Sequence, residues 1–333
     1  MIKIQTILNP LDSMQSWYLL RSDFQDECKK LKIKFTNHEP DILIVNQTML
    51  SENILKLDIP IIILERIDSC SITKRRELKH NNVIGIIKNT SFRDPNYHNL
   101  ATYNGRYHSK LVIENNDKMK NYSSEITDYE IQLDENDFQK IELGWTFGLY
   151  EKFRNCNSLD INFDLNRDID LNFYGTINYK SDDMIKFHRY QCLDAIKDLK
   201  NCTAACGGGR PLLDGQYRDL LIKSKATLSP WGYGEACYRD FEAIYYGSVL
   251  IKPDSSHVIG KQDIYQNNKY YIPCKIDFSD LQEKIDYIKN NWEQLKEMRI
   301  SARKYLFSFY DIKKQALDFK AIIDRCCSRI KKM

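Results

Sequence analysis

Short apolar runs alternate with helix-like segments along most of this chain, and this alternation restricts its fold more than any other feature. Several of the runs are apolar at almost every position, "IPIIILE" at 59–65 being the clearest. Runs of this kind are typical of parallel strands that helices cover on both faces. In the first half, strand-like runs are expected at 2–8, 41–46, 59–65 and 82–89, with helix-like segments at 16–32, 49–57 and 73–81.

The same alternation restarts near residue 169. Strand-like runs are expected at 169–175, 201–209, 226–230 and 248–253, and helix-like segments at 182–200, 217–225, 234–246, 279–306 and 311–331. A chain of 333 residues suits two domains of roughly 150 residues each. The sequence therefore predicts an α/β protein with two Rossmann-like domains that face a cleft.

The predicted boundaries place an N-terminal Rossmann-like domain at 1–150, a C-terminal Rossmann-like domain at 151–310 and a closing helix at 311–333. The segment 142–168 is interpreted as the crossover between the domains, with a helix as one option. Residues 90–135 give no clear pattern of strands or helices.

Composition narrows the classes of protein that the chain resembles. With 49 basic and 46 acidic residues the net charge is +3, which does not indicate a nucleic-acid-binding face. The apolar runs are too short for a transmembrane segment, and the N-terminus lacks the pattern of a signal peptide. The ten cysteines contain no CxxC pair, so reduced thiols and a cytoplasmic location are expected.

The segment "SPWGYGEACYRDFEAIYYGSVLIKPD" at 229–254 carries the clearest functional pattern. It combines the end of a strand, a glycine-containing loop, a helix and a second strand. Ligands of open parallel sheets bind where strands lead into helices, and a helix N-terminus favours phosphate. Arg239 lies in the first turn, where its guanidinium can reach a diphosphate, and Glu242 lies on nearly the same face, where it can bind ribose hydroxyls. The alternative is a surface ion pair beside two turn glycines, since the loop does not match GxGxxG.

This segment resembles the nucleotide-sugar-binding segment of GT-B glycosyltransferases, most closely the exostosin-like group. The shared pattern is a strand, a glycine-containing loop, Arg-x-x-Glu-Ala on a helix, a glycine, and a strand that ends in proline. "IDLNFYGTINY" and "FHRYQCLDAI" resemble the start of the same donor domain, so the resemblance covers about 168–260. The N-terminal half agrees in architecture only.

The resemblance implies a role for individual residues. Arg239 and the loop from Gly232 to Gly234 would hold the donor diphosphate, and Glu242 the ribose. Residues from neighbouring loops and helices would complete the site. Gly175 and Thr176 would lie beside the diphosphate or sugar, and Arg189 would be a second phosphate contact. Gly207 to Arg210 would line the base or phosphate pocket, and Trp231 and Tyr233 would stack on the ligand or wedge the loop. An ordinary turn or surface role is the alternative for several of these residues.

Glycosyl transfer also needs a base that deprotonates the acceptor hydroxyl. Asp68 and, next, Glu65 follow the apolar run at 59–65 and are expected to face the cleft, with His108 and His38 as further candidates. The DxD at Asp168–Asp170 is interpreted as the polar face of a strand rather than as a metal site. No metal ion and no cofactor besides the nucleotide-sugar donor are predicted.

Together these patterns predict a glycosyltransferase, a hexosyl- or pentosyltransferase of glycan biosynthesis. It would move a sugar from a UDP-sugar, or next a GDP-sugar, to a saccharide or glycoconjugate acceptor. A nucleotide-sugar epimerase that does not use NAD and a non-catalytic nucleotide-sugar-binding module are the alternatives. An NAD-dependent dehydrogenase is disfavoured because no glycine follows the first strand-like run, in "ILNPLDSMQSW".

Overall fold

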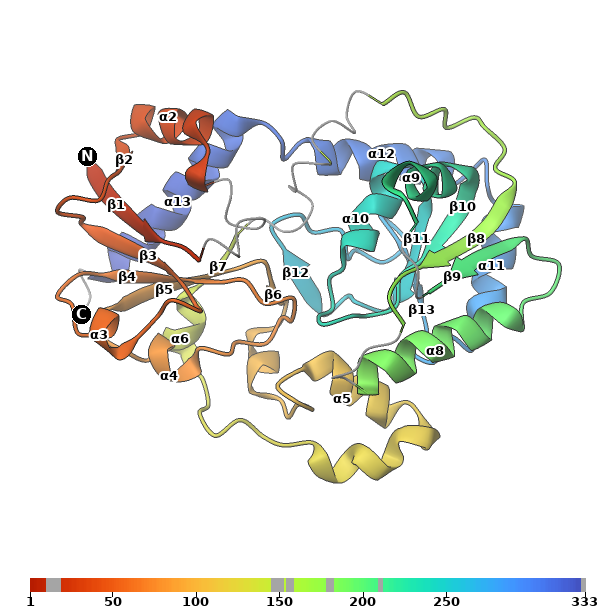
Figure 1. Ribbon diagram of the computed structural model, residues 1–333, viewed down its shortest axis with the longest axis horizontal. Coiled ribbons are helices and arrows are strands. Elements are labelled where there is room, and N and C mark those ends of the chain that lie inside the picture. Colours follow the sequence, from red (N-terminus) through yellow and green to blue (C-terminus); the bar gives the residue numbers. More distant parts are fainter. Residues whose placement is uncertain (10–18, 145–152, 154–158, 178–182, 209–211, 331–333) are drawn as a thin grey trace.

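The computed structural model describes residues 1–9, 19–144, 153, 159–177, 183–208 and 212–330. It contains two parallel sheets, each with helices around it, arranged side by side along the long axis of the molecule (Figure 1). The predicted α/β fold with two Rossmann-like domains facing a cleft, the GT-B type, is therefore confirmed.

The first domain is built on a six-stranded sheet of order β2-β1-β3-β4-β5-β7, and all its pairings are parallel. Its strands are β1 (Ile2–Ile7), β2 (Ile33–Phe35), β3 (Ile42–Asn46), β4 (Ile61–Glu65), β5 (Val83–Lys88) and β7 (Ile141–Leu143). The helices of this part of the chain are α2 (Ser22–Lys30), α3 (Glu52–Leu55), α4 (Arg75–Leu78), η2 (Pro95–Asn99), α5 (Tyr107–Glu114), η3 (Asp117–Glu125) and α6 (Glu135–Gln139).

Strand β4 shows why the apolar runs predicted this sheet. Its five residues are all buried, and successive side chains enter different cores. Ile61 and Ile63 pack on the face that α3 and α4 cover, whereas Ile62 and Leu64 pack on the opposite face with α2. Side chains alternate across a strand, so burial of both faces requires an uninterrupted apolar run.

The last helix of the chain, α13 (Ile312–Ile330), returns to the first domain and lies beside α2 (Figure 1). Phe319 and Ile323 are fully buried in the same core as Phe24 of α2. Glu142 of β7 accepts hydrogen bonds from Arg325 and Arg329, with the shortest distances to each at 2.6 and 2.7 Å. The closing helix is thus part of the first domain's core.

The second domain has a five-stranded parallel sheet of order β13-β11-β10-β8-β9. Its strands are β8 (Ile169–Tyr174), β9 (Ala204–Gly207), β10 (Ser224–Leu228), β11 (Val249–Pro253) and β13 (Ile272–Cys274). Its helices are α8 (Asp183–Lys197), α9 (Asp214–Lys223), α10 (Tyr238–Tyr245), α11 (Leu281–Asn290) and α12 (Lys296–Phe307).

Several helix boundaries differ from the prediction, and two of these differences have a local cause. Helix α10 begins at Tyr238 rather than at 234, because the Asp240 carboxylate accepts a hydrogen bond from the Cys237 N–H at 2.9 Å and closes the first turn there. The pattern at 279–306 forms two helices rather than one. The first ends at Asn290, the next residue is also an asparagine, a residue of modest helix propensity, and the second helix begins at Lys296. Within the crossover predicted at 142–168, residues 145–152 and 154–158 lie outside the described residues.

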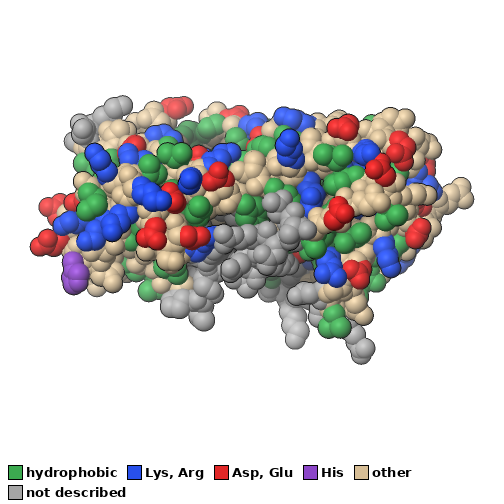
Figure 2. Space-filling model, turned by 90° about the horizontal axis from the view of Figure 1, so that it is seen from above, with side chains coloured by type: hydrophobic (Ala, Val, Ile, Leu, Met, Phe, Trp, Pro, Cys, Tyr) green, Lys and Arg blue, Asp and Glu red, His purple; other side chains and the backbone are tan. Residues whose placement is uncertain are grey.

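An antiparallel ribbon links the two domains. Strand β6 (Thr90–Phe92) pairs with β12 (Val258–Gly260), and Arg93 donates to Asp263 at 2.9 Å beside the ribbon. On the face shown in Figure 2, basic and acidic side chains of the described residues are interspersed. Among the described helices, none combines the length and apolar character needed to cross a membrane.

Candidate active site

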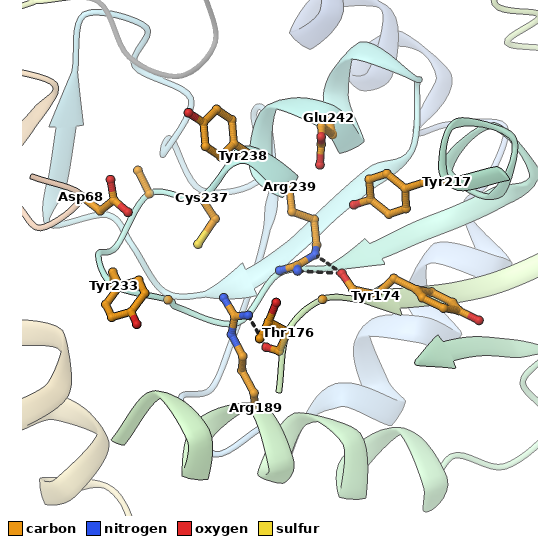
Figure 3. Close-up of a pocket in the computed structure, with 13 residues that line it drawn as sticks. Asp68, Tyr174, Thr176, Arg189, Tyr217, Tyr233, Cys237, Tyr238, Arg239 and Glu242 are labelled. Atoms are coloured by element: carbon orange, nitrogen blue, oxygen red, sulfur yellow. Dashed lines mark hydrogen bonds between the residues drawn. The ribbon is translucent and has the colours of Figure 1, made fainter. Parts of the chain in front are cut away.

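A cavity of about 350 Å³ lies at the carboxyl ends of β8 and β10, where the second domain faces the loop that follows β4 (Figure 3). This is the edge of a parallel sheet at which loops and helix N-termini meet and ligands bind. The cavity is lined by Asp68, Tyr174, Gly175, Thr176, Arg189, Tyr217, Gly232, Tyr233, Ala236, Cys237, Tyr238, Arg239 and Glu242.

Arg239 lies in the first turn of α10 and extends across the end of β8. Its Nε and Nη2 donate to the Tyr174 carbonyl oxygen at 3.1 and 2.7 Å, and its guanidinium lies over the Phe173 ring. The side chain is 8% exposed, and its Nη1 has no hydrogen-bond partner among the described residues. A buried donor without a partner is costly, so this nitrogen is suited to an anionic ligand in the cavity.

Arg189 of α8 brings a second guanidinium to the same place. Its Nη1 donates to the Thr176 carbonyl oxygen at 2.5 Å. A methyl group at Gly175 would lie 2.2 Å from Arg239 Nη2 and 3.6 Å from Arg189 Nη1, so both cations face one backbone position. Two guanidinium groups repel each other unless an anion lies nearby, so together with the N-terminus of α10 they make this part of the cavity suited to an anionic ligand.

Glu242 and Tyr217 line the side of the cavity that lies away from Asp68 (Figure 3). Glu242 is 7% exposed and lies one turn after Arg239, as predicted from the i, i+3 spacing. The Tyr217 hydroxyl faces Arg239 and Glu242 (Figure 3). Burial is the main cause that raises the pKa of Tyr217 above its ordinary value, and the negative charge of Glu242 adds to it. A carboxylate beside a phenol offers an acceptor and a donor to the hydroxyls of a ribose.

The loop between β10 and α10 reaches the first domain at Gly234. A Cβ atom at this position would lie 1.7 Å from the Asp68 carbonyl oxygen and 2.6 Å from the Ser69 nitrogen, so only glycine fits. Gly234 therefore does not line the cavity but sets the contact between the domains, whereas Gly232 and Tyr233 line it. This contact brings Asp68 to the cavity wall, where its carboxylate is drawn in Figure 3.

Glu65, the second predicted base, does not reach the cavity. Its carboxylate is fully buried, lies 2.7 Å from Lys88 Nζ, and accepts hydrogen bonds from the Thr73 N–H and hydroxyl at 2.8 and 2.5 Å. These contacts shape the loop that carries Asp68. The geometry supports a structural role for Glu65 and gives no support to Glu65 as the base.

The other candidates also lie outside the cavity. His108 is buried with its Nε2 at 3.1 Å from the Gly232 carbonyl oxygen, and His38 is in an exposed loop. Trp231 is 1% exposed, and its Nε1 donates to the Ser255 hydroxyl at 3.0 Å, so it wedges the loop rather than stacking on a ligand. Gly207 packs against the Tyr174 ring, and Arg210 lies outside the described residues.

One carboxylate of the DxD motif, that of Asp170 in β8, is held by lysines. It is buried and lies 2.8 Å from Lys225 Nζ and 3.2 Å from Lys289 Nζ, whereas Asp168 is exposed. Within the described residues, His, Cys, Asp and Glu form no cluster of three suited to a metal ion. That no metal ion is required stays a prediction.

Several lining residues were not predicted from the sequence: Tyr174, Tyr217, Ala236, Cys237 and Tyr238. Tyr174 and Cys237 had a usable signal, because each ends a strand or loop that leads to the predicted phosphate site. Burial raises the pKa of the Cys237 thiol, which disfavours a thiolate nucleophile at this position. Tyr217 enters the cavity from α9, and its sequence context gives no sign of that.

Comparison with known proteins locates the chain among its relatives. No curated protein matches the sequence. Many solved structures are similar over nearly the whole chain, and three serve as examples. They are an alpha-glucosyltransferase in complex with UDP and a 13-mer DNA containing a HMU base (12% identity, 98% of this chain and 99% of that chain, TM-score 0.46), an alpha1,3-fucosyltransferase (16%, 97% and 90%, 0.43) and a glycosyltransferase from Rickettsia africae ESF-5 (12%, 97% and 98%, 0.46).

A family model, the RXYLT1 C-terminal domain, matches residues 150–323, just over half of the chain. The matched region contains β8, α8, α9 and α10, and with them every lining residue of the cavity except Asp68. It also includes the segment whose resemblance to the exostosin-like donor domain was predicted, and that prediction is confirmed. The chain belongs to the RXYLT1 C-terminal domain family.

Proposed function

We propose that this protein is a glycosyltransferase that moves a sugar from a nucleotide-diphosphate donor to a saccharide or glycoconjugate acceptor. The observation that carries the proposal is the convergence of Arg239, Arg189 and the N-terminus of α10 on one cavity, with Glu242 one turn away. Positive groups that converge beside a carboxylate suit a ligand with a diphosphate and a ribose.

In this mechanism Arg239 and Arg189 bind the diphosphate oxygens and stabilise the charge that develops as the bond between the anomeric carbon and the phosphate oxygen breaks. Glu242 accepts hydrogen bonds from the ribose. Asp68 lies on the other side of the cavity from Glu242 (Figure 3). It accepts the proton of the acceptor hydroxyl while the acceptor oxygen forms its bond to the anomeric carbon. Because two arginines and a helix N-terminus supply positive charge, we propose that the reaction needs no divalent cation.

We propose a UDP-sugar as the preferred donor and a GDP-sugar next. The cavity, at about 350 Å³, falls within the range for ligand sites, about 300–1,000 Å³. The transferred sugar is a hexose or a pentose, and the product belongs to glycan biosynthesis. The scattered cysteines favour reduced thiols, so we place the activity in the cytoplasm.

The test is release of UDP or GDP by purified protein from a panel of nucleotide sugars, with and without saccharide acceptors and with EDTA. Acceptor-dependent release that Asp68→Asn lowers, and EDTA does not, supports the proposal. Conversion of the donor without an acceptor indicates an epimerase instead. Nucleotide binding without any turnover indicates a binding module, and absence of binding to every nucleotide refutes the proposal.

A further inference from the structure

Glu235 is a buried charged residue that the proposed reaction does not use. It lies in the loop of residues 231–237, which we call the donor loop, yet it does not line the cavity. Its side chain is fully buried and points into the contact between the domains rather than to the ligand site. A carboxylate placed in such a contact is costly unless its partners are well arranged.

The partners of Glu235 come from two separate segments of the first domain. Its Oε2 accepts a hydrogen bond from the Cys70 N–H at 3.0 Å and lies 3.5 Å from His108 Nδ1. Burial alone would raise the pKa of this carboxyl, but His108, with further contributions from His257 and the Cys70 amide, lowers it to about 2. The histidines and the Cys70 amide thus favour the carboxylate form of Glu235 against its burial.

His108 also holds the donor loop from its other nitrogen. Its Nε2 donates to the Gly232 carbonyl oxygen at 3.1 Å, so one imidazole contacts both ends of the segment 232–235. Between these ends, Gly234 lies directly against the Asp68 backbone. The donor loop is thus held on one side by α5, which carries His108, and on the other by residues 68–70.

We propose that Glu235 and His108 are a positioning pair that fixes the donor loop against the backbone of residues 68–70. The pair thereby sets the distance from Asp68 to the diphosphate site across the two domains. This inference rests on the proposed function, because it assigns the pair an effect on transfer rather than on nucleotide binding. Arg239 and Arg189 donate hydrogen bonds within the second domain, to the carbonyl oxygens of Tyr174 and Thr176.

The kinetic test uses Glu235→Gln, which keeps the size and an acceptor but removes the charge. We expect kcat to fall about 10- to 100-fold, since a displacement of about 1 Å at a reacting group has an effect of that size. The Kd for UDP is expected to change less than threefold. Because the pair acts through Asp68, Glu235→Gln should lower kcat no further in an Asp68→Asn background. A kcat within threefold of wild type, or an additive fall in that background, overturns the proposal.

Two further variants separate positioning from general damage. His108→Gln should reproduce the fall in kcat, and it serves as the test if Glu235→Gln does not fold. Asp263→Asn removes a different ion pair between the domains, that with Arg93 at 2.9 Å, and should leave kcat unchanged. A fall of similar size in the control variant contradicts the proposal, because any loosening of the domains would then suffice.

A readout without turnover keeps this inference distinguishable from the proposed function. Hydrogen exchange of the peptide covering residues 66–74 should be at least tenfold faster in Glu235→Gln, while that of β10 is unchanged. If wild-type protein transfers no sugar, the proposed function is wrong. The exchange of this peptide still decides whether the pair fixes the loop, and unchanged exchange refutes it.

Discussion

Replacing Gly234 by alanine is the sharpest test of how the two domains form the site. The added Cβ would lie 1.7 Å from the Asp68 carbonyl oxygen and 2.0 Å from its carbon. Ordinary contacts begin at 3.4 Å, so the two backbones must separate by roughly 1.7 Å. The atoms that the Cβ would meet belong to the backbone of Asp68 and Ser69, not to a flexible side chain. The hydrogen bond from the Cys70 N–H to Glu235 holds this backbone against the donor loop.

The expected cost follows from this geometry. Overpacking of a well-packed contact destabilises proteins by about 1–3 kcal/mol, and a clash between two backbones belongs at the upper end of that range. We therefore expect Gly234→Ala to lower the free energy of unfolding by about 3 kcal/mol. Moving Asp68 away from the diphosphate site by more than 1 Å should also lower kcat about 100-fold.

Urea denaturation measures the first effect, and donor turnover at saturating acceptor measures the second. Gly215→Ala is the matched control, because a Cβ at Gly215, near the start of α9, meets no atom within 4 Å. That variant should gain about 0.5–1 kcal/mol of stability, since alanine is favoured over glycine in a helix, and should keep wild-type kcat. The reasoning is wrong if Gly234→Ala unfolds at the same urea concentration as wild type.

Two further predictions concern ligand binding and pH. In Gly175→Ala the new methyl group would meet the movable end of Arg239, at 2.2 Å from Nη2. UDP affinity measured by calorimetry should therefore fall at least tenfold, while the urea midpoint stays near that of the wild type. An unchanged UDP affinity would contradict the assignment of Arg239 to the phosphate. Burial lowers the pKa of His98 and of His188 to about 3, so their unfolded forms bind protons first as pH falls below 6.5. Each should therefore lower the free energy of unfolding by about 2 kcal/mol between pH 7.5 and 5.0, and an unchanged urea midpoint at pH 5.0 would show that they are not buried as neutral imidazoles.

The parallel sheets were predictable because their strands are buried on both faces and are therefore continuous apolar runs. The run Ile61–Glu65 is one example, and the helix with Arg239 and Glu242 was predictable because it follows a strand of this kind after a short loop. These signals are local, and the spacing of a few residues along one element is enough to read them.

The remaining features depend on partners far away in the sequence. Glu65 ends β4 and Asp68 follows it, but only the contact with Lys88, 23 residues after Glu65, shows that Glu65 is buried and structural. The strands β6 and β12 have three residues each, too few for a periodic pattern, and they pair across more than 160 residues. Glu235 likewise meets Cys70 from 165 residues away. No spacing within the donor loop indicates these contacts.

The central claim is that Arg239 binds the diphosphate of a nucleotide sugar, and calorimetric titration of UDP into wild-type and Arg239→Ala protein tests it most directly. Losing charge-assisted hydrogen bonds of about 1.5–3 kcal/mol should weaken UDP binding about 10- to 100-fold. Arg218→Ala, which removes an exposed arginine of α9, should bind UDP as the wild type does. If Arg239→Ala binds UDP with unchanged affinity, or if wild-type protein binds neither UDP nor GDP, the account is wrong.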